Sequence, residues 1–331
     1  MERDDRVTGL SDIEAAATRL SGISIRTPLL RNAELDQLAG GAVLIKPECL
    51  QLTGSFKIRG AYNFLSQLSL EQARRGVVAW SSGNHAQGVA AAGGMLGIPT
   101  AIVMPEDAPR AKLSNTRRLG GEVITYDRYT GDREAIARGI AAERGAEVVP
   151  SYDHGHIIAG QGTVGLEIAE QSLEMKLPAD QVLICCGGGG LTAGSAIALK
   201  ARLPDAAVHT VEPEEFDDTA RSLELGKRVT VDDSARSICD ALQAHTPGKL
   251  TFEINRQLLG PGLSVSDDEV RDAMRFAFRN LKLVVEPGGA VALAAVLAGK
   301  IETKGRTTAI VLSGGNVDVE LFAEIQKGAS G

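Results

Sequence analysis

The sequence predicts an α/β protein of two domains, each built on a twisted, mostly parallel sheet flanked by helices. Two observations support this fold class. Short apolar runs bounded by turn residues recur along the chain, as expected of strands buried on both faces of a sheet, and helical patterns separate them. Such strand–helix–strand alternation is typical of parallel sheets covered by helices on both sides. The length of 331 residues accommodates one large domain or two of ordinary size.

The predicted strands and helices alternate along most of the chain. We expect a strand at each short apolar run, namely Val77–Trp80, Thr100–Met104, Glu122–Tyr126, Val182–Cys186, Val208–Val211 and Thr308–Leu312. We expect helices over Asn84–Leu96, Pro109–Leu119, Asp132–Arg144, Thr163–Leu173, Thr192–Leu203, Asp267–Leu281 and Ala290–Leu297. Pro109 supports a helix start, because a proline in the first turn costs no hydrogen bond.

The strand–helix units form two groups, and a predicted loop over Ser151–Ala159 separates them. We therefore expect a small domain over residues 51–150 and a large domain over residues 1–50 and 151–331. Because ligands often bind at domain interfaces, we expect the active site in the cleft between the two domains.

The charge of the chain argues against two classes of partner. The 35 Lys and Arg residues and 42 Asp and Glu residues give a formal net charge of −7, whereas proteins that bind nucleic acid or an anionic membrane usually need a basic face. The longest apolar run, Ala290–Ala298, is far shorter than the ~20 residues of a membrane-spanning helix. We expect neither a nucleic-acid partner nor a membrane partner.

The amino terminus and the cysteines favour a reducing compartment. The first residues, MERDDRVTGL, are charged and lack the apolar region of a secretory signal. The four cysteines, Cys49, Cys185, Cys186 and Cys239, show no Cys-x-x-Cys spacing. We therefore expect a cytoplasmic protein.

Lys57 is a candidate for covalent chemistry. It stands in the segment Thr53–Ala61, directly after Ser55 and Phe56 and close to two glycines. A lysine must be neutral to attack a carbonyl group, and a semi-apolar, partly buried setting lowers its pKa. The alternative, a solvated surface lysine, is favoured as long as this segment is considered alone.

Two segments follow predicted strands and open predicted helices. In Ser81–Gly88, side-chain donors from serine and asparagine join the free N–H groups of a helix start, which suits a carboxylate or a phosphate. The alternative is an ordinary helix cap. The four glycines Gly187–Gly190 would let backbone N–H groups surround a phosphate.

The tetraglycine segment also fits a rival hypothesis. Gly188, Gly190 and Ala193 match the G-x-G-x-x-A fingerprint of dinucleotide-binding proteins, and Glu212 follows at a strand end with the usual spacing. This pattern would suit a nicotinamide-dependent oxidoreductase. A single fingerprint of this kind has low specificity.

Three more turns carry candidate residues. The acidic loop Val211–Asp218 offers carboxylates and backbone carbonyls, which suit a divalent cation such as Mg²⁺ or Ca²⁺, although a solvated acidic loop is the simpler interpretation. In Leu312–Val317, Ser313 could donate a hydrogen bond to a heteroaromatic nitrogen or cap the last helix. Glu286, just before the predicted helix Ala290–Leu297, is expected to be an exposed carboxylate or a first-turn charge.

Five motifs occur together in a fixed order: Ser-Phe-Lys-Ile-Arg-Gly-Ala at 55–61, Ser-Gly-Asn-His-Ala-Gln-Gly at 82–88, Ala-Gly-Gln-Gly-Thr at 159–163, the tetraglycine at 187–190 and Ser-Gly-Gly-Asn at 313–316. In these motifs the chain resembles the fold type II pyridoxal-phosphate enzymes of the serine/threonine dehydratase and serine racemase family, including 3-hydroxyaspartate dehydratases. The resemblance runs from Thr27 to Asn316. Five ordered motifs are more specific than the dinucleotide fingerprint.

The resemblance implies a role for each motif. Lys57 would bond covalently to the aldehyde of pyridoxal 5'-phosphate and then act as the general base at Cα. The cofactor would also contact Phe56, Asn84, Gly187, Gly188, Gly189, Gly190, Leu191 and Ser313. The substrate carboxylate would lie among Ser81, Ser82, Asn84 and His85. A divalent cation (Mg, Mn or Ca) would be held by Glu212, the Phe216 carbonyl and Asp218.

The activity implied by the resemblance is that of a lyase, which releases ammonia from L-threonine, L-serine or 3-hydroxyaspartate, in a homodimer. Ser82 replaces the alanine of ordinary threonine dehydratases and matches racemases, so serine racemase with dehydratase side activity is the first alternative. Tyr152 stands where mammalian racemases carry asparagine beside the cofactor, which argues against a pure racemase. A nicotinamide-dependent oxidoreductase is the alternative from another class.

Overall fold

The computed structural model describes residues 8–81, 83–108, 110–127 and 130–328. It contains two parallel sheets. The five-stranded sheet has the order β1-β9-β6-β7-β8, with bounds β1 Ala42–Pro47, β6 Gln181–Cys185, β7 Ala207–Pro213, β8 Leu263–Val265 and β9 Thr307–Leu312. The four-stranded sheet has the order β4-β3-β2-β5, with bounds β2 Val77–Trp80, β3 Thr100–Pro105, β4 Glu122–Tyr126 and β5 Glu147–Val148.

The helices surround both sheets. Their bounds are α1 Leu10–Leu20, α2 Ala33–Ala39, α3 Lys57–Leu65, α4 Leu70–Arg75, α5 Asn84–Leu96, α6 Arg110–Arg118, α7 Arg133–Arg144, α8 Gly155–Glu174, α9 Gly190–Arg202, α10 Asp218–Leu225, α11 Lys249–Leu258, α12 Asp267–Phe276, α13 Pro287–Leu297 and α14 Val319–Lys327. A π-helical turn, Ala277–Leu281, continues α12. Within the described residues, no helix has both the length and the apolar character to cross a bilayer.

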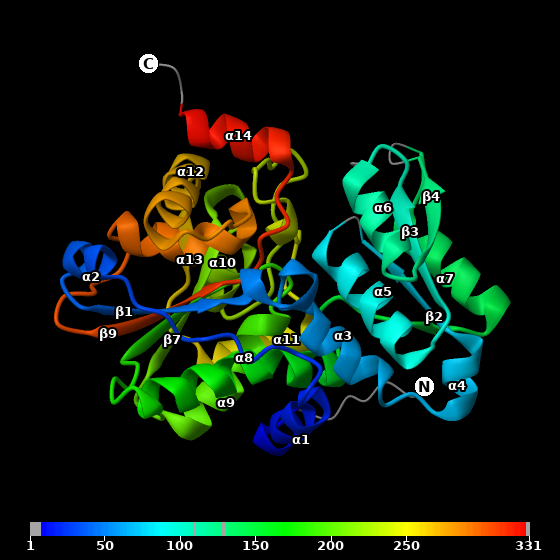
Figure 1. Ribbon diagram of the computed structural model, residues 1–331, viewed down its shortest axis with the longest axis horizontal. Coiled ribbons are helices and arrows are strands. Elements are labelled where there is room, and N and C mark those ends of the chain that lie inside the picture. The colour runs from blue at the N-terminus through cyan, green and yellow to red at the C-terminus, as the bar shows by residue number, and fades with distance from the viewer. Residues whose placement is uncertain (1–7, 82, 109, 128–129, 329–331) are drawn as a thin grey trace.

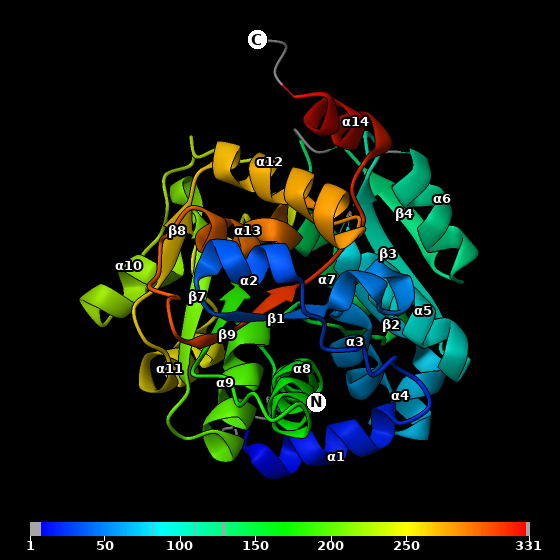
Figure 2. The ribbon, with the colours of Figure 1, turned by 60° about the vertical axis from the view of Figure 1, so that its left-hand side comes forward.

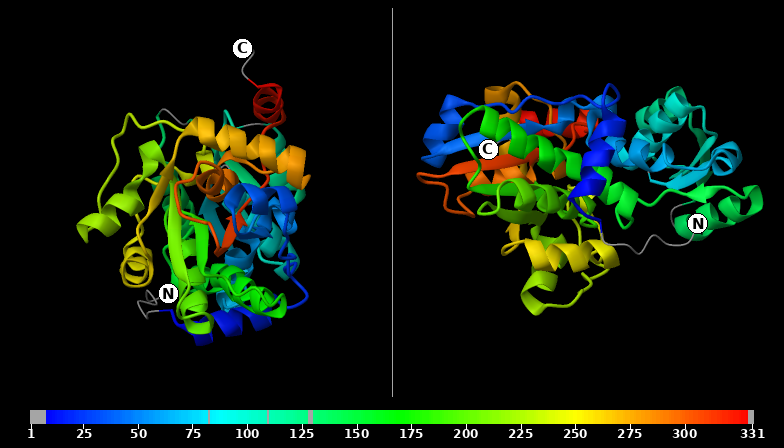
Figure 3. Two further views of the ribbon diagram at one scale, coloured as in Figure 1. Left: turned by 90° about the vertical axis from the view of Figure 1, so that its left-hand side faces the viewer. Right: turned by 90° about the horizontal axis from the view of Figure 1, so that it is seen from below.

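Each sheet forms the centre of one lobe. In the large lobe, α2, α12 and α13 cover one face of the five-stranded sheet, and α8 and α9 cover the other (Figure 2). In the small lobe, α5 and α6 lie on one side of the four-stranded sheet and α7 on the other (Figure 1). The lobes stand side by side when the molecule is viewed from below (Figure 3). The α/β fold class with helix-covered parallel sheets is confirmed, whereas the domain boundaries at residues 50 and 150 stay a prediction.

The predicted loop over Ser151–Ala159 is wrong in its second half, because α8 begins at Gly155. The predicted loop contains one glycine, Gly155, and three more follow in the same helix, at positions 160, 162 and 165. A Cβ atom on Gly160 would lie only 2.6 Å from the carbonyl oxygen of Arg59 on α3. Gly160 therefore permits the close contact between α8 and α3.

Strand β1, which pairs in parallel with β9, was not predicted from the sequence. Lys46 is the fifth of the six residues of this strand and is completely buried. A charged residue argues against a buried strand unless a partner neutralises it. Here the ammonium group lies 2.6 Å from a carboxylate oxygen of Glu167 on α8, a residue far away in the sequence.

Candidate functional site

Lys57 is the first residue of α3, and the chain before it is fixed to the end of β9. Ser55 forms an antiparallel bridge with Gly314. The N–H group of Phe56 donates to the carbonyl oxygen of Ser313 at 3.2 Å. These contacts hold the start of α3 against the turn that follows β9, although the two segments are far apart in the sequence.

The amine of Lys57 lies in a partly buried setting. Its Nζ donates to the carbonyl oxygen of Ser151 at 3.1 Å and stands 5.1 Å from the centroid of the Phe56 ring. Burial lowers the pKa of Lys57 to about 8. Roughly a tenth of the amine is therefore neutral at pH 7, far more than for an ordinary lysine, and nucleophilic or basic chemistry requires the neutral form.

Asn84 opens α5 and joins three segments. Its Nδ2 donates to Glu286 Oε1 at 2.5 Å, and its Oδ1 accepts from Asn316 Nδ2 at 2.7 Å. Asn316 Nδ2 also donates to the carbonyl oxygen of Thr53 at 2.8 Å, four residues before Lys57. Asn84 is thus held in a fixed orientation close to the turn that carries Lys57.

The environment of Glu286 differs from the one expected from the sequence. We expected an exposed carboxylate, but the side chain is only 4% exposed and lies beside Asn84. Burial raises the pKa of Glu286 to about 7. The signal that could have found it is its neighbourhood, since a lone acid between the apolar run Leu283–Val285 and the apolar helix α13 is typical of a buried position.

His85 follows Asn84 and is also buried. Its Nε2 lies 3.2 Å from the carbonyl oxygen of Val149. Burial, together with the nearby charge of Lys57, lowers the pKa of His85 to about 3. The imidazole is therefore neutral, so that any help it gives to a substrate carboxylate comes from hydrogen bonding rather than from charge.

The tetraglycine connects β6 to α9. The carbonyl oxygen of Gly188 accepts from Thr251 Oγ1 at 2.7 Å, and that of Gly189 accepts from Thr192 Oγ1 at 2.8 Å. Gly189 adopts a φ of +91°, a conformation that favours glycine. Because the first N–H groups of a helix have no partner within it, the start of α9 offers several donors to an anion.

Tyr152 covers this segment from the loop before α8. A Cβ atom on Gly188 would overlap its ring, so the ring lies directly on the glycine backbone. The preceding residue, Ser151, is the one that accepts from Lys57. Two adjacent residues of this loop therefore contact the two parts of the site. Ser151 accepts from the amine of Lys57, and Tyr152 packs on the tetraglycine.

Ser313 and Cys185 lie at the ends of neighbouring strands, β9 and β6. Both side chains are buried, at 5% and 3% exposed, and they form a hydrogen bond with each other. Burial raises the pKa of the Cys185 thiol to about 11, so the thiol stays protonated. No site role was predicted for Cys185; its position two residues before the glycines was the available signal.

The structure thus brings most of the predicted site residues together, at the carboxyl ends of β6 and β9 and at the starts of α3, α5 and α9. Ser81 lies beside them at the end of β2, where its Oγ accepts from the N–H group of Gly83 at 3.2 Å. Ser82 lies outside the described residues.

The acidic loop follows β7 and forms a second candidate site. Both carboxylate oxygens of Glu212 accept backbone N–H groups, from Thr219 at 3.0 Å and Ala220 at 2.7 Å. This carboxylate therefore does not stand free at the strand end, as a dinucleotide ribose would require. Phe216 belongs to a short 3₁₀ turn, Glu214–Phe216, and Asp218 begins α10.

Asp218 and Glu212 are completely buried acids. Among the described residues, neither carboxylate oxygen of Asp218 has a hydrogen-bond partner. Burial raises the pKa of Asp218 to about 7, and burial together with the Asp218 charge raises the pKa of Glu212 well above its ordinary value. Two such acids and a backbone carbonyl suit a hard divalent cation, although no cluster of three side-chain ligands occurs in the described part of the chain.

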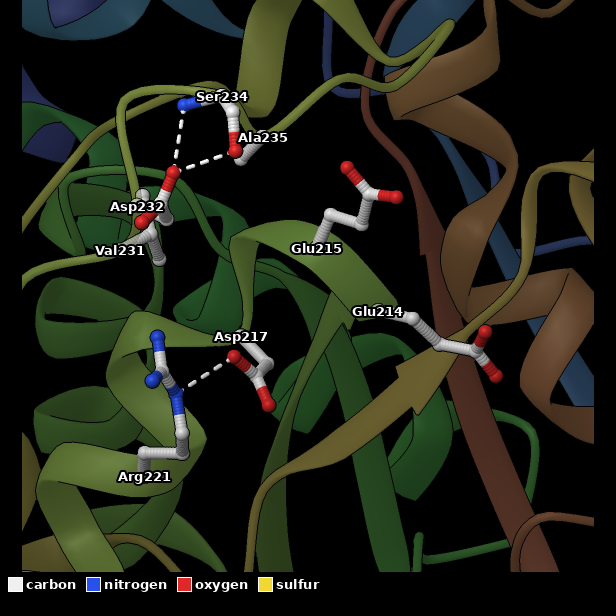
Figure 4. Close-up of a pocket in the computed structure, with 8 residues that line it drawn as sticks. All are labelled: Glu214, Glu215, Asp217, Arg221, Val231, Asp232, Ser234 and Ala235. Carbon is white, nitrogen blue, oxygen red and sulfur yellow. Dashed lines mark hydrogen bonds and ion pairs between the residues drawn. The ribbon is translucent and has the colours of Figure 1, made fainter.

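An open pocket lies next to this loop, with Glu214, Glu215 and the Asp217–Arg221 ion pair on its wall (Figure 4). Neither Glu212 nor Asp218 lines it. The exposed acids of the pocket are therefore distinct from the buried pair.

Comparison with known proteins agrees with this geometry. The family model described as pyridoxal-phosphate dependent enzyme matches residues 20–314. The chain is 44% identical over 323 residues to an L-threo-3-hydroxyaspartate ammonia-lyase of Pseudomonas sp, which covers 98% of this chain and 100% of the relative. It is 41% identical to the serine racemase of Schizosaccharomyces pombe, with coverage of 94% and 95%.

Two solved structures extend the comparison. Maize serine racemase superposes with a TM-score of 0.91 at 36% identity, covering 96% of each chain. A threonine deaminase from T.th. superposes with a TM-score of 0.88 at 42% identity, covering 94% of this chain and 99% of its own. On sequence, fold and site geometry together, the chain belongs to the family of pyridoxal-phosphate dependent enzymes.

Proposed function

We propose that the protein is an ammonia-lyase that uses pyridoxal 5'-phosphate to convert a β-hydroxy amino acid into a 2-oxo acid and ammonia. The observation that carries the proposal is the partly buried amine of Lys57, with its pKa lowered to about 8, beside the tetraglycine segment. Relatives named ammonia-lyase or dehydratase over nearly the full length of the chain support the reaction class.

The residues at the site fit the cofactor. The start of α9 has N–H groups free for a phosphate, while the neighbouring glycine carbonyls are already occupied by Thr251 and Thr192. Lys57 supplies an amine that can bond to an aldehyde. The cofactor-binding residues in this proposal are Phe56, Lys57, Asn84, Gly187, Gly188, Gly189, Gly190, Leu191 and Ser313.

The cofactor, when bound, supplies an electron sink for the electron pair left at Cα. The chain supplies the proton transfer and the orientation. The start of α5, with Ser81, Asn84 and His85, would hold the substrate carboxylate, and neutral Lys57 would remove the proton from Cα. Ser313 would place an uncharged hydroxyl at the ring nitrogen, which favours prompt loss of the β-hydroxyl over a long-lived carbanion.

The test compares wild type, Lys57→Ala and the control Lys304→Ala, which changes an exposed lysine. We expect purified wild type supplied with the cofactor to show a visible absorption band and to release oxo acid from at least one of L-serine, L-threonine and L-threo-3-hydroxyaspartate. Lys57→Ala should lose the band and at least ~100-fold of the rate, in line with removal of a general base. An unchanged band in Lys57→Ala would overturn the lysine assignment.

A serine racemase with dehydratase side activity is the second candidate, favoured by the 41% identity to the Schizosaccharomyces pombe serine racemase. On this hypothesis the hydroxyl of Ser82 would exchange the proton on the face of Cα opposite Lys57. Measuring the interconversion of L- and D-serine against ammonia release separates the two activities. Ser82→Ala should abolish interconversion and leave elimination from the Lys57 face.

We propose further that Glu212, the Phe216 carbonyl and Asp218 hold a divalent cation such as magnesium. The support is the pair of buried acids, of which Asp218 has no hydrogen-bond partner among the described residues. A homodimer is proposed from the family resemblance alone, and sedimentation analysis of the holoenzyme tests it.

A further inference from the structure

Glu286 is a buried acid that the proposed chemistry at Cα does not use. Its side chain is only 4% exposed, and a carboxylate in such a setting is usually paired with a cation. Within the part of the chain that the structure describes, no lysine or arginine forms an ion pair with Glu286, and its side chain bonds the neutral amide of Asn84. An acid kept in this costly setting, next to a residue of the proposed site, points to a role there.

The carboxylate of Glu286 is fixed against the turn that follows β9. Its backbone N–H group donates to the carbonyl oxygen of Gly314 at 3.0 Å. A Cβ atom on Gly314 would overlap Glu286 Oε1 and would lie 3.2 Å from Asn84 Nδ2. Both side chains therefore rest on the backbone of Gly314, and the absence of a side chain at this position permits their contact.

The direction of each hydrogen bond around Asn84 follows from one backbone carbonyl. The carbonyl oxygen of Thr53 can only accept, so the Asn316 atom that lies 2.8 Å from it is Nδ2. The same Nδ2 lies 2.7 Å from the Asn84 side chain, which must therefore present Oδ1 to Asn316. Asn84 Nδ2 is then the atom that faces Glu286, at 2.5 Å, and donates to it. Asn316 thus decides which end of the amide is the donor, and Glu286 decides where that donor lies.

Asn84 retains a second side-chain N–H group beside Lys57. An amide nitrogen carries two N–H groups, and among the described residues Glu286 is the single acceptor of Asn84 Nδ2. A Cβ atom on Gly88, about one turn after Asn84 on α5, would lie 3.1 Å from the backbone carbonyl carbon of Lys57. The charge of Lys57 also lowers the pKa of Glu286, which burial raises. The second N–H group is therefore held next to the proposed cofactor site.

We propose that Glu286 is a positioning residue: by accepting one N–H group of Asn84 Nδ2, it directs the second one to the 3-oxygen of pyridoxal 5'-phosphate. This inference rests on the cofactor site of the proposed function. It commits both side-chain donors of Asn84, so that the contribution of Asn84 to binding a substrate carboxylate is its backbone N–H group at the start of α5. Glu286 acts through Asn84 and contacts neither cofactor nor substrate.

The experiment measures the Kd of pyridoxal 5'-phosphate for the full-length apoprotein. Asn84→Ala removes a hydrogen bond to a charged oxygen, which predicts a rise in Kd of roughly 10- to 100-fold. Glu286→Ala leaves the amide but not its orientation, so we expect a smaller rise, of roughly 3- to 30-fold. Glu286→Gln retains an acceptor and should stay within about 3-fold of wild type. Glu224→Ala, which changes an exposed glutamate of α10, is the control and should leave Kd unchanged.

Two further measurements distinguish positioning from a merely structural role. If Glu286 acts through Asn84, Glu286→Ala should add nothing to the effect of Asn84→Ala when the two are combined. With 3-deoxypyridoxal 5'-phosphate, which lacks the 3-oxygen, Glu286→Ala should bind as tightly as wild type. Additive effects of the two substitutions, or an equal loss of affinity for both forms of the cofactor, would overturn the inference. Glu286→Met, which fills the space without an acceptor, provides the same test if Glu286→Ala does not fold.

The outcomes separate this inference from the function on which it rests. An unchanged Kd in Glu286→Ala, with release of oxo acid by wild type, overturns the role of Glu286 alone. Wild type that binds the cofactor but releases no oxo acid from any β-hydroxy amino acid overturns the ammonia-lyase proposal alone. A wild-type apoprotein that does not bind pyridoxal 5'-phosphate overturns both.

Discussion

Two regions of this molecule each hold a pair of carboxylates that is largely shielded from solvent, but they neutralise the charge in different ways. In the first, Glu48 forms a two-pronged pair with the Arg59 guanidinium at 2.8 and 2.9 Å, and both side chains are completely buried. Arg59 also bonds Glu167 at 2.6 and 2.9 Å, and Lys46 adds a second cation to Glu167. The two acids, Glu48 and Glu167, are thus paired with two cations of the same chain.

In the second region, Glu212 and Asp218 are both completely buried, yet no lysine or arginine forms an ion pair with either of them within the described residues. The contrast is visible in the pKa values. Burial alone would raise the pKa of Glu48, but the Arg59 guanidinium outweighs it and holds this pKa below the ordinary value. At Glu212 burial and the neighbouring Asp218 act in the same direction and raise it.

Only the first of these regions is complete in itself. The Arg59 cluster is closed, and it anchors α3 to β1 and α8 only two residues after Lys57, so it fixes the amine relative to the large lobe. The Glu212–Asp218 pair has no ion-pair partner in the described part of the chain, and in our proposal a cation from solution completes it. Four changes test this distinction, beginning with the largest expected effect.

Removing the guanidinium should give the largest effect. Arg59→Met leaves the buried Glu48 and the partly buried Glu167 with one cation instead of two, and breaking a buried pair in this way costs about 3–5 kcal/mol. Urea unfolding of the apoprotein, compared with wild type, measures the loss. Adding Glu48→Gln to Arg59→Met should recover part of the stability, because it removes the uncompensated charge; a double variant that is less stable than Arg59→Met would contradict a closed ion cluster.

The Glu286 carboxylate is intermediate between a carboxylate paired with a cation and one without an ion pair. It accepts a hydrogen bond from the neutral amide of Asn84. Its pKa in the folded protein, about 7, is above the ordinary value of 4.5. The folded state therefore holds its proton more tightly, and this contribution to stability is complete below about pH 4.5 and lost as pH rises through about 7. The loss amounts to about 3 kcal/mol.

Glu286→Gln keeps an oxygen that accepts from Asn84 but removes the titration. We expect urea unfolding of apo Glu286→Gln to depend less on pH than that of wild type between about pH 5 and pH 8. An identical pH dependence in the two proteins would show that this carboxylate does not titrate in that range.

Removing the proposed divalent cation at Glu212 and Asp218 should lower the stability of the folded state by an amount similar to, or smaller than, the contribution of Glu286. A ligand present at ~100 times its Kd stabilises the folded state by about 2.7 kcal/mol, so a chelator should lower the melting temperature and magnesium should restore it. Asp218→Asn should abolish this response. Asp217→Asn is the matched control, because Asp217 pairs with Arg221 instead of facing Glu212; loss of the response in both variants would place the cation elsewhere.

The sequence predicted those parts of the fold and site that adjacent residues define. The tetraglycine was found because strand, glycine turn and helix follow one another along the chain. Lys57 was singled out by the resemblance of five ordered motifs, since its own segment favours a surface lysine. Glu286 was misplaced because its burial depends on Asn84, 202 positions away. Strand β1 was missed for the same reason, since the burial of Lys46 depends on Glu167. A polar partner that is far away in the sequence leaves no local pattern around the charged residue. The burial of charged residues is therefore not predicted by sequence periodicity.

The smallest effect is expected at the surface, where the same guanidinium–carboxylate fork recurs. Arg144 bonds both oxygens of Glu122, at 2.5 and 3.0 Å, but the two side chains are 42% and 55% exposed. Water competes for both ions and salt screens them, so Arg144→Gln should cost less than about 1 kcal/mol. Urea unfolding at low and high salt measures it. If Arg144→Gln proved as costly as Arg59→Met, fork geometry rather than burial would set the strength of these pairs, and the contrast between the two buried regions would lose its physical basis.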